Sequence, residues 1–125
     1  MTLIDTSAWI EALRKDGDLS VRTRVATLLE TGHAVLCNIV ILELWNGARG
    51  DRERSKLRRI TETLDRVPIS DVVWMTANNL ATSCRKKGIT VPATDLIVAA
   101  TARVHRLDLL EADHHFQMIP RDTVS

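Results

Sequence analysis

The chain has 125 residues, a formal net charge of +1, and 45% hydrophobic and 26% charged residues. This balance excludes a largely disordered chain, so we expect a single folded domain over residues 1–125. No apolar stretch approaches the ~20 residues that a membrane-spanning helix needs. The first residues have no basic segment and reach an acid at Asp5, which argues against a signal peptide and favours a cytoplasmic protein.

The expected elements alternate between short strands and helices. In chain order we expect a strand at 2–5, helices at 7–15 and 18–31, a strand at 33–37, helices at 39–48 and 51–65, a short strand or connector at 67–69, helices at 71–87 and 94–106, and last strand candidates at 109–110 and 117–119. Helical spacing of apolar residues and glycine stops support the helices. This order predicts a three-layer α/β/α domain with a short-stranded, mainly parallel central sheet. Sites in such sheets form beyond the carboxyl ends of the strands.

Four carboxylates lie where apolar runs meet turns or helices: Asp5, Glu43, Asp95 and Asp113. Asp5 and Asp95 could each sit at the start of a helix, and Asp113 could be an ordinary turn acid. Glu43 is harder to explain in this way, because it interrupts an apolar run. Carboxylates are costly to bury unless they are paired or hold a cation.

Clustered carboxylates repel one another, by about 4 kcal/mol per pair at ~4 Å and an effective dielectric near ~20. A cation between them would relieve this repulsion. Four oxygen donors with no paired cysteine or histidine suit Mg²⁺ or Mn²⁺ better than zinc. We therefore expect a divalent metal site if the four acids meet.

The cysteines and the histidine pair have simpler interpretations. Cys37 and Cys84 stand alone without metal-ligand spacing and are expected in the core as free thiols. His114 and His115 are adjacent, so their side chains face different ways, and we expect the pair to face solvent.

Basic residues gather in two places. Residues 49–59 hold six Lys or Arg against two acids, and residues 85–87 read Arg-Lys-Lys. Each cluster could be a solvated helix face or a surface that contacts phosphates. The candidate RNA-binding residues are Arg49, Arg52, Arg54, Arg85 and Lys86. With 3% aromatic residues, a base-stacking surface is disfavoured.

Four segments resemble, in order, the motifs of PIN-domain ribonucleases. They are residues 5–10 (DTSAWI), 41–49 (ILELWNGAR), 93–102 (ATDLIVAATA) and 112–116 (ADHHF). The compact size and the second segment are most similar to VapC toxins, the ribonuclease half of type II toxin–antitoxin pairs. The resemblance implies a cytoplasmic, dimeric endoribonuclease that needs Mg²⁺ or Mn²⁺, cleaves RNA phosphodiester bonds and is inhibited by a cognate VapB-type antitoxin.

The resemblance also implies roles for single residues. By motif position, the catalytic and metal-binding acids would be Asp5, Glu43, Asp95 and Asp113. Asp5 and Asp95 would bind the metal ion, and the other two would act directly or through water. Ser7, and also Thr6, would supply a supporting hydroxyl near the metal.

The chain departs from the family in its fourth motif. Many members have another acid where this chain has His115, and often a hydroxyl residue where it has Glu111 or Ala112. The alternative is therefore a catalytically weakened PIN scaffold that binds protein or RNA. Other hydrolase classes fit less well: a dehalogenase-type phosphatase needs a second Asp at the position of Ser7, and a flap-type DNA nuclease is much larger.

Overall fold

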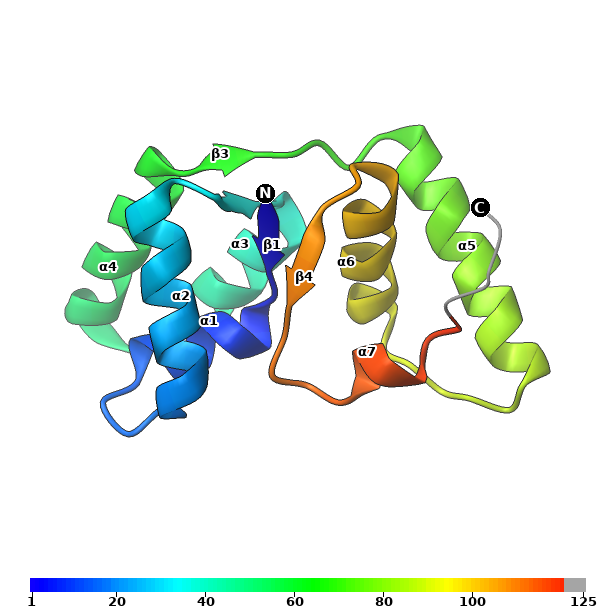
Figure 1. The fold of residues 1–125 in the computed structure, drawn as a ribbon, viewed down its shortest axis with the longest axis horizontal. Coiled ribbons are helices and arrows are strands. Elements are labelled where there is room, and N and C mark those ends of the chain that lie inside the picture. The colour runs from blue at the N-terminus through cyan, green and yellow to red at the C-terminus, as the bar shows by residue number, and fades with distance from the viewer. Residues whose placement is uncertain (121–125) are drawn as a thin grey trace.

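The sheet has four parallel strands in the order β3-β2-β1-β4, flanked by helices (Figure 1). The computed structural model describes residues 1–120. The strands are β1 (Thr2–Ile4), β2 (Ala34–Leu36), β3 (Asp65–Arg66) and β4 (Asp108–Leu110). The helices are α1 (Thr6–Leu13), α2 (Leu19–Thr31), α3 (Asn38–Asn46), α4 (Gly50–Thr63), α5 (Asp71–Lys86), α6 (Ala93–Val104) and α7 (His115–Met118). The expected short-stranded parallel α/β fold is confirmed.

The strand order places a topological switch point between β1 and β4. From β1 the chain moves to β2 on one side, and later returns to pair β4 on the other side of β1. The carboxyl ends of β1 and β4 lie at one edge of the sheet, where α7 and the start of α6 also lie (Figure 1). Ligands of open parallel sheets bind at such a crevice. The fold therefore indicates where to look for a site.

The core is made of two apolar clusters that share α6. One lies around the central strands, where Leu3, Ile4 and Leu36 are fully buried. The other lies between α5 and α6 and includes Leu80. Helix α6 gives Val98 to the first cluster and other residues to the second, and seven consecutive residues after Asp95 are buried. Because both sides of α6 are packed, its amino-terminal end is held firmly.

One strand candidate and one helix boundary are wrong. Residues 117–119 are not a strand, because His115–Met118 form the short helix α7, whose start is fixed by the Asp113 side chain accepting from the His115 amide (2.9 Å). The strand after α4 is Asp65–Arg66, so Asp65 belongs to a strand rather than the preceding helix, and residues 67–69 form a connector. Both β3 residues are exposed, so no apolar pattern marks this strand in the sequence.

Cys37 and Cys84 are both free and buried, as expected. Among residues 1–120, no helix has the length and apolar character needed to cross a membrane.

Candidate metal centre at the carboxyl edge of the sheet

Asp5 is the first residue after β1 and is only 3% exposed. It is the N-cap of α1, and its Oδ2 accepts from the backbone amide of Ser7 (3.0 Å) and from the Ser7 hydroxyl (2.6 Å). The Ser7 hydroxyl in turn accepts from the backbone amide of Ala112 (2.9 Å), in the loop after β4. Burial raises the pKa of Asp5, although the hydrogen bonds from Ser7 oppose the change. Ser7 thus joins the first carboxylate to the fourth motif.

Asp95 lies in the first turn of α6 and is 9% exposed. It does not cap this helix, since Pro92 holds the N-cap position and no side chain there makes a cap bond. Instead its Oδ2 lies 3.2 Å from Nδ1 of His115. Burial, and then the negative charges of Asp5 and Asp113, raise the pKa of Asp95 to about 6. The first and fourth motifs therefore act electrostatically on the third.

Asp113 and His115 complete a compact group with Asp95. Nδ1 of His115 lies 2.9 Å from Oδ1 of Asp113, and one ligand atom from each of the three residues lies within 4.8 Å of the others. The expectation that both histidines face solvent is wrong for His115, whose side chain is 33% exposed. It holds for His114, at 79%. The difference arises because α7 begins at residue 115 and turns that ring toward α6.

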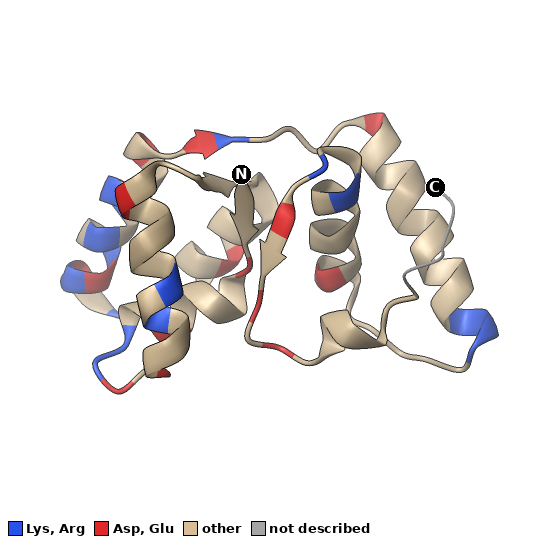
Figure 2. Cartoon of the chain, viewed as in Figure 1, with Lys and Arg blue, Asp and Glu red and all other residues tan. Residues whose placement is uncertain are grey.

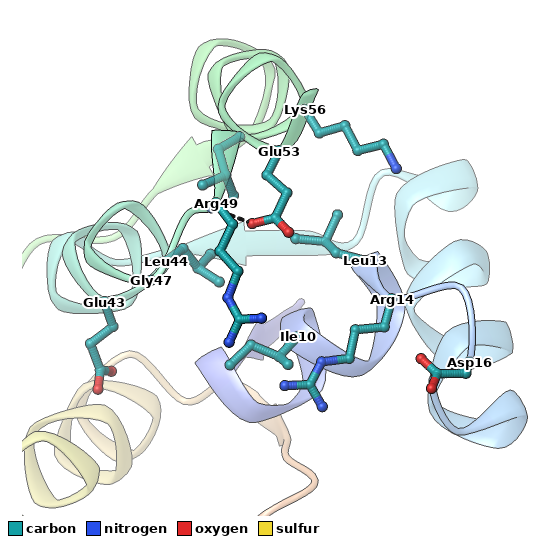
Figure 3. Close-up of a pocket in the computed structure, with 11 residues that line it drawn as sticks. Ile10, Leu13, Arg14, Asp16, Glu43, Leu44, Gly47, Arg49, Glu53 and Lys56 are labelled. Atoms are coloured by element: carbon teal, nitrogen blue, oxygen red, sulfur yellow. Dashed lines mark hydrogen bonds between the residues drawn. The ribbon is translucent and has the colours of Figure 1, made fainter. Parts of the chain in front are cut away.

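Glu43 lies in α3 beside the first motif. Its Oε1 accepts a hydrogen bond from the Thr6 hydroxyl (2.8 Å), one residue after Asp5. Figure 3 shows its side chain pointing from α3 toward α6. After burial, the charges of Asp5 and Glu43 both raise the pKa of the Cys37 thiol, which places all three residues in one neighbourhood. The four predicted acids thus lie at the same edge of the sheet.

Glu111 is a further acid that the sequence did not single out. Burial raises its pKa, and so do the nearby charges of Asp5 and Asp113. Its position directly after β4 was the available signal, because the carboxyl ends of neighbouring parallel strands meet. Like-charged carboxylates with raised pKa values fit a hard divalent cation, which favours their ionised form.

The two predicted basic clusters lie at opposite ends of the molecule (Figure 2), on α4 and at the end of α5, with acidic residues between them. Arg85 and Lys86 belong to the α5 end, away from α4. In α4, Arg54 pairs with Asp51 at 3.0 Å on an exposed surface. Arg52 is exposed on the same helix.

Arg49 lines a pocket of about 320 Å³ between α1, α3 and α4. Its floor is apolar and includes Ile10 and Leu44, and Glu43 lies at one side. Arg14, which the sequence did not suggest, brings its guanidinium group toward that of Arg49 over Ile10 (Figure 3). The pocket therefore adjoins the acidic edge through Glu43. Its other charged lining residues are of both signs: Arg14, Arg49 and Lys56 are basic, and Asp16 and Glu53 are acidic.

The PIN domain family model matches residues 2–122. The chain belongs to the PIN domain family. Ribonuclease VapC11 of Mycobacterium tuberculosis is 30% identical to it over 98% of this chain and 94% of the relative. Ribonuclease VapC21 of the same species is 32% identical, over 80% and 75%. VapBC2 of Rickettsia felis, solved bound to a DNA fragment from its promoter, has the same fold with a TM-score of 0.78 and 21% identity, covering 95% of this chain and 92% of that one.

We expect ionisation of Asp95 to destabilise the metal-free PIN domain as the pH rises. Its folded pKa of about 6 lies above the ordinary 3.8, so the native state holds more protons than the unfolded state in this interval. The metal-free free energy of unfolding should therefore fall as the pH rises from about 4 through about 6, by up to about 3 kcal/mol from this group at about 1.4 kcal/mol per pKa unit.

Asp95→Asn removes this charge and should stabilise the metal-free protein above pH 6. Thermal melting in chelator between pH 4 and 8 measures the effect. The exposed Asp71→Asn should leave the pH dependence unchanged. A wild-type melting temperature that rises steadily over the same interval would contradict the prediction.

Proposed function

We propose that residues 1–125 form one PIN domain that acts as a cytoplasmic ribonuclease toxin, cleaves RNA phosphodiester bonds and is neutralised by a cognate VapB-type antitoxin. The observation that carries the proposal is the grouping of three acids at the β1/β4 switch point: Ser7 links Asp5 to the loop after β4, and His115 links Asp113 in that loop to Asp95. Support for the activity comes from relatives named VapC ribonucleases that align over nearly the full chain. Support for the antitoxin comes from the VapBC complexes that share this fold.

The proposed cofactor is Mg²⁺, for which Mn²⁺ can substitute. When bound, such an ion offsets the charge on a phosphate oxygen and makes a water molecule a stronger nucleophile at neutral pH. Asp5 and Asp95 would hold the ion, because they are the most buried acids of residues 1–120 and carry raised pKa values. Asp113 and Glu43 would act directly or through water.

The two hydroxyl residues would orient the carboxylates. Ser7 donates to Oδ2 of Asp5 and so determines which carboxylate oxygen of Asp5 remains available to the ion. Thr6 donates to Glu43 and holds it from the neighbouring helix. Both act on the reaction through another residue, so we assign them a positioning role.

The alternative, a weakened scaffold without chemistry, has less support. It rested on the altered fourth motif, where His115 replaces an acid. Asp113 nevertheless interacts electrostatically with both Asp5 and Asp95, and Glu111 adds a negative charge nearby. The relatives VapC11 and VapC21 are named as ribonucleases.

Replacement of the buried acids tests the proposed activity. Asp5→Asn and Asp95→Asn should each lower RNA cleavage at least about a hundredfold, because each removes a charge that the ion needs. Chelation should abolish cleavage by the wild type, and DNA assayed beside RNA should stay intact. The exposed Asp71→Asn is the matched control. Normal RNA cleavage by both site variants would contradict the proposed activity.

The path of the RNA is proposed to run from the acidic edge into the pocket of Figure 3. Arg14 and Arg49 line this pocket together with Glu43, so phosphates beside the scissile bond would meet two cations. Among residues 1–120, neither guanidinium group makes an ion pair with a carboxylate. Arg52 and Arg54 would extend the path along α4. Arg85 and Lys86 would contact RNA only if it spans the molecule.

Neutral substitutions test this path. Arg14→Gln and Arg49→Gln should each raise KM for RNA several-fold and flatten its dependence on salt, because phosphate contacts supply salt-dependent affinity. The value of kcat should change little. Arg85→Gln is the distant comparison and should have the smaller effect. Equal effects at all three positions would argue against a path through the pocket.

We also propose that the protein is a homodimer that pairs through α5. This helix turns Val73 and Leu80 into the core, while Trp74 and Met75 on its other side are 47% and 64% exposed. Large apolar side chains that lie together on the solvent-exposed surface are typical of an interface. The family resemblance points to a second copy of this chain as the occupant.

A charge on this face should separate the two copies. Trp74→Glu and Met75→Glu should shift the mass measured by size-exclusion chromatography with light scattering from dimer to monomer, because a carboxylate would be buried without a partner. Leu19→Glu, at an apolar position on α2 that is more exposed still (73%), should leave the mass unchanged. A monomeric wild type at micromolar concentration would refute the dimer.

A further inference from the structure

His115 stands at a position where many PIN domains have an acid, and its side chain still lies among the carboxylates of the site. Its Nδ1 lies 2.9 Å from Oδ1 of Asp113 and 3.2 Å from Oδ2 of Asp95. The three atoms belong to one group whose members lie within 4.8 Å of one another. A nitrogen so placed contacts the two carboxylate oxygens that would otherwise face each other across the site.

These separations fit a shared ion. Adjacent ligands of an octahedral ion with bonds of about 2.1 Å lie about 3 Å apart, close to both distances made by Nδ1. A hydrogen-bonding imidazole would show similar distances, so separation alone does not distinguish the two roles. The orientation of the ring favours the role of metal ligand, because one nitrogen points toward two carboxylates from different elements, α6 and the loop after β4.

The ring is held in this position by its own backbone. The amide of His115 donates to Oδ1 of Asp113 (2.9 Å), which fixes the first residue of α7 against the acid. On the outer side, the ring of His114 lies with its centroid 4.8 Å from that of His115. His115 is one-third exposed, so the ring can exchange partners without disturbing the core. The arrangement is therefore a positioned donor rather than a buried packing residue.

A nitrogen donor changes which ion the site prefers. Mg²⁺ takes oxygen ligands and gives up water reluctantly, whereas imidazole suits first-row transition ions better. Two carboxylates and one imidazole form a donor set that Mn²⁺ accepts readily. Binding through Nδ1 leaves the ring proton on Nε2, which faces away from the two acids.

We propose that His115 is a metal ligand through Nδ1, and that with Asp95 and Asp113 it makes this centre select Mn²⁺ over Mg²⁺. The inference rests on the proposed function, since it assumes that a divalent ion binds among these acids. It goes further by assigning a nitrogen ligand to this chain and by making Mn²⁺, rather than Mg²⁺, the ion that the site binds more tightly.

Pulsed electron paramagnetic resonance of bound Mn²⁺ tests the ligand directly. The purified full chain, stripped with chelator and loaded with Mn²⁺ below one equivalent, should show ¹⁴N modulation from a coordinated imidazole. The signal should vanish in His115→Gln and in His115→Asp, which supplies an oxygen instead. His114→Gln is the matched control, because it removes the neighbouring exposed histidine and should keep the signal.

Calorimetric titration with Mn²⁺ and with Mg²⁺ tests the preference. The ratio of Mn²⁺ affinity to Mg²⁺ affinity should fall at least about tenfold in both His115 variants. It should be unchanged in His114→Gln. Thermal melting of each metal-free variant verifies that it is folded. The two His115 variants differ in charge. If one of them does not fold, the other still tests the proposal.

The outcomes separate this inference from the proposed function. Mn²⁺ binding that needs Asp95 but shows no ¹⁴N modulation, or modulation that persists in His115→Gln, overturns the histidine ligand and leaves the ribonuclease proposal standing. An absence of any Mn²⁺ binding that needs Asp95 overturns both. Modulation confined to chains that keep His115, with the altered ratio, supports the assignment.

Discussion

The structure depends on holding several like charges together where little water reaches them. Asp5 and Asp95 are 3% and 9% exposed, and each carries a raised pKa because burial disfavours its charged form. Mutual repulsion would move free side chains apart. Here the backbone cannot relax, because Asp5 directly follows a buried strand and Asp95 lies in the first turn of a buried helix. Core packing elsewhere offsets the electrostatic cost, and the stored repulsion favours binding of a cation.

The acids differ in how firmly they are held. Asp95 stands on α6, which packs into both apolar clusters, and Asp5 is fixed by β1 and by two hydrogen bonds from Ser7. Asp113 lies in the loop between β4 and the four-residue helix α7, and it is more exposed. The two firm acids can define where a ligand sits, while the looser segment can adjust to it. Variation of the fourth motif is therefore tolerated without loss of the fold.

The sequence predicted features that local pattern encodes. Acids at the edges of apolar runs located the end of β1 and the first turn of α6, and the alternation of elements predicted the parallel sheet. It failed where specific hydrogen bonds, rather than an apolar pattern, decide the conformation. Helix α7 begins because Asp113 accepts from an amide two residues on, and the direction of His115 follows from that turn. Strand β3 is exposed on both residues, and only its pairing with β2 makes it a strand.

The four motifs are physically linked through short hydrogen bonds. Glu43 accepts from Thr6, and the next residue, Ser7, donates to Asp5 and accepts from the amide of Ala112. Asp113 follows directly, and the ring of His115 spans from it to Asp95. The hydrogen bond between Ser7 and Ala112 joins residues that are 105 positions apart in the sequence.

Polar groups joined in this way strengthen or weaken together in a medium of low dielectric constant. Each acid can therefore serve a local purpose, such as the N-cap role of Asp5, and still belong to one centre. Local capping explains where Asp5 begins a helix, but it does not explain why Ser7 also binds the loop after β4. That connection requires the acids to be positioned relative to one another, which a set of independent helix caps would not need.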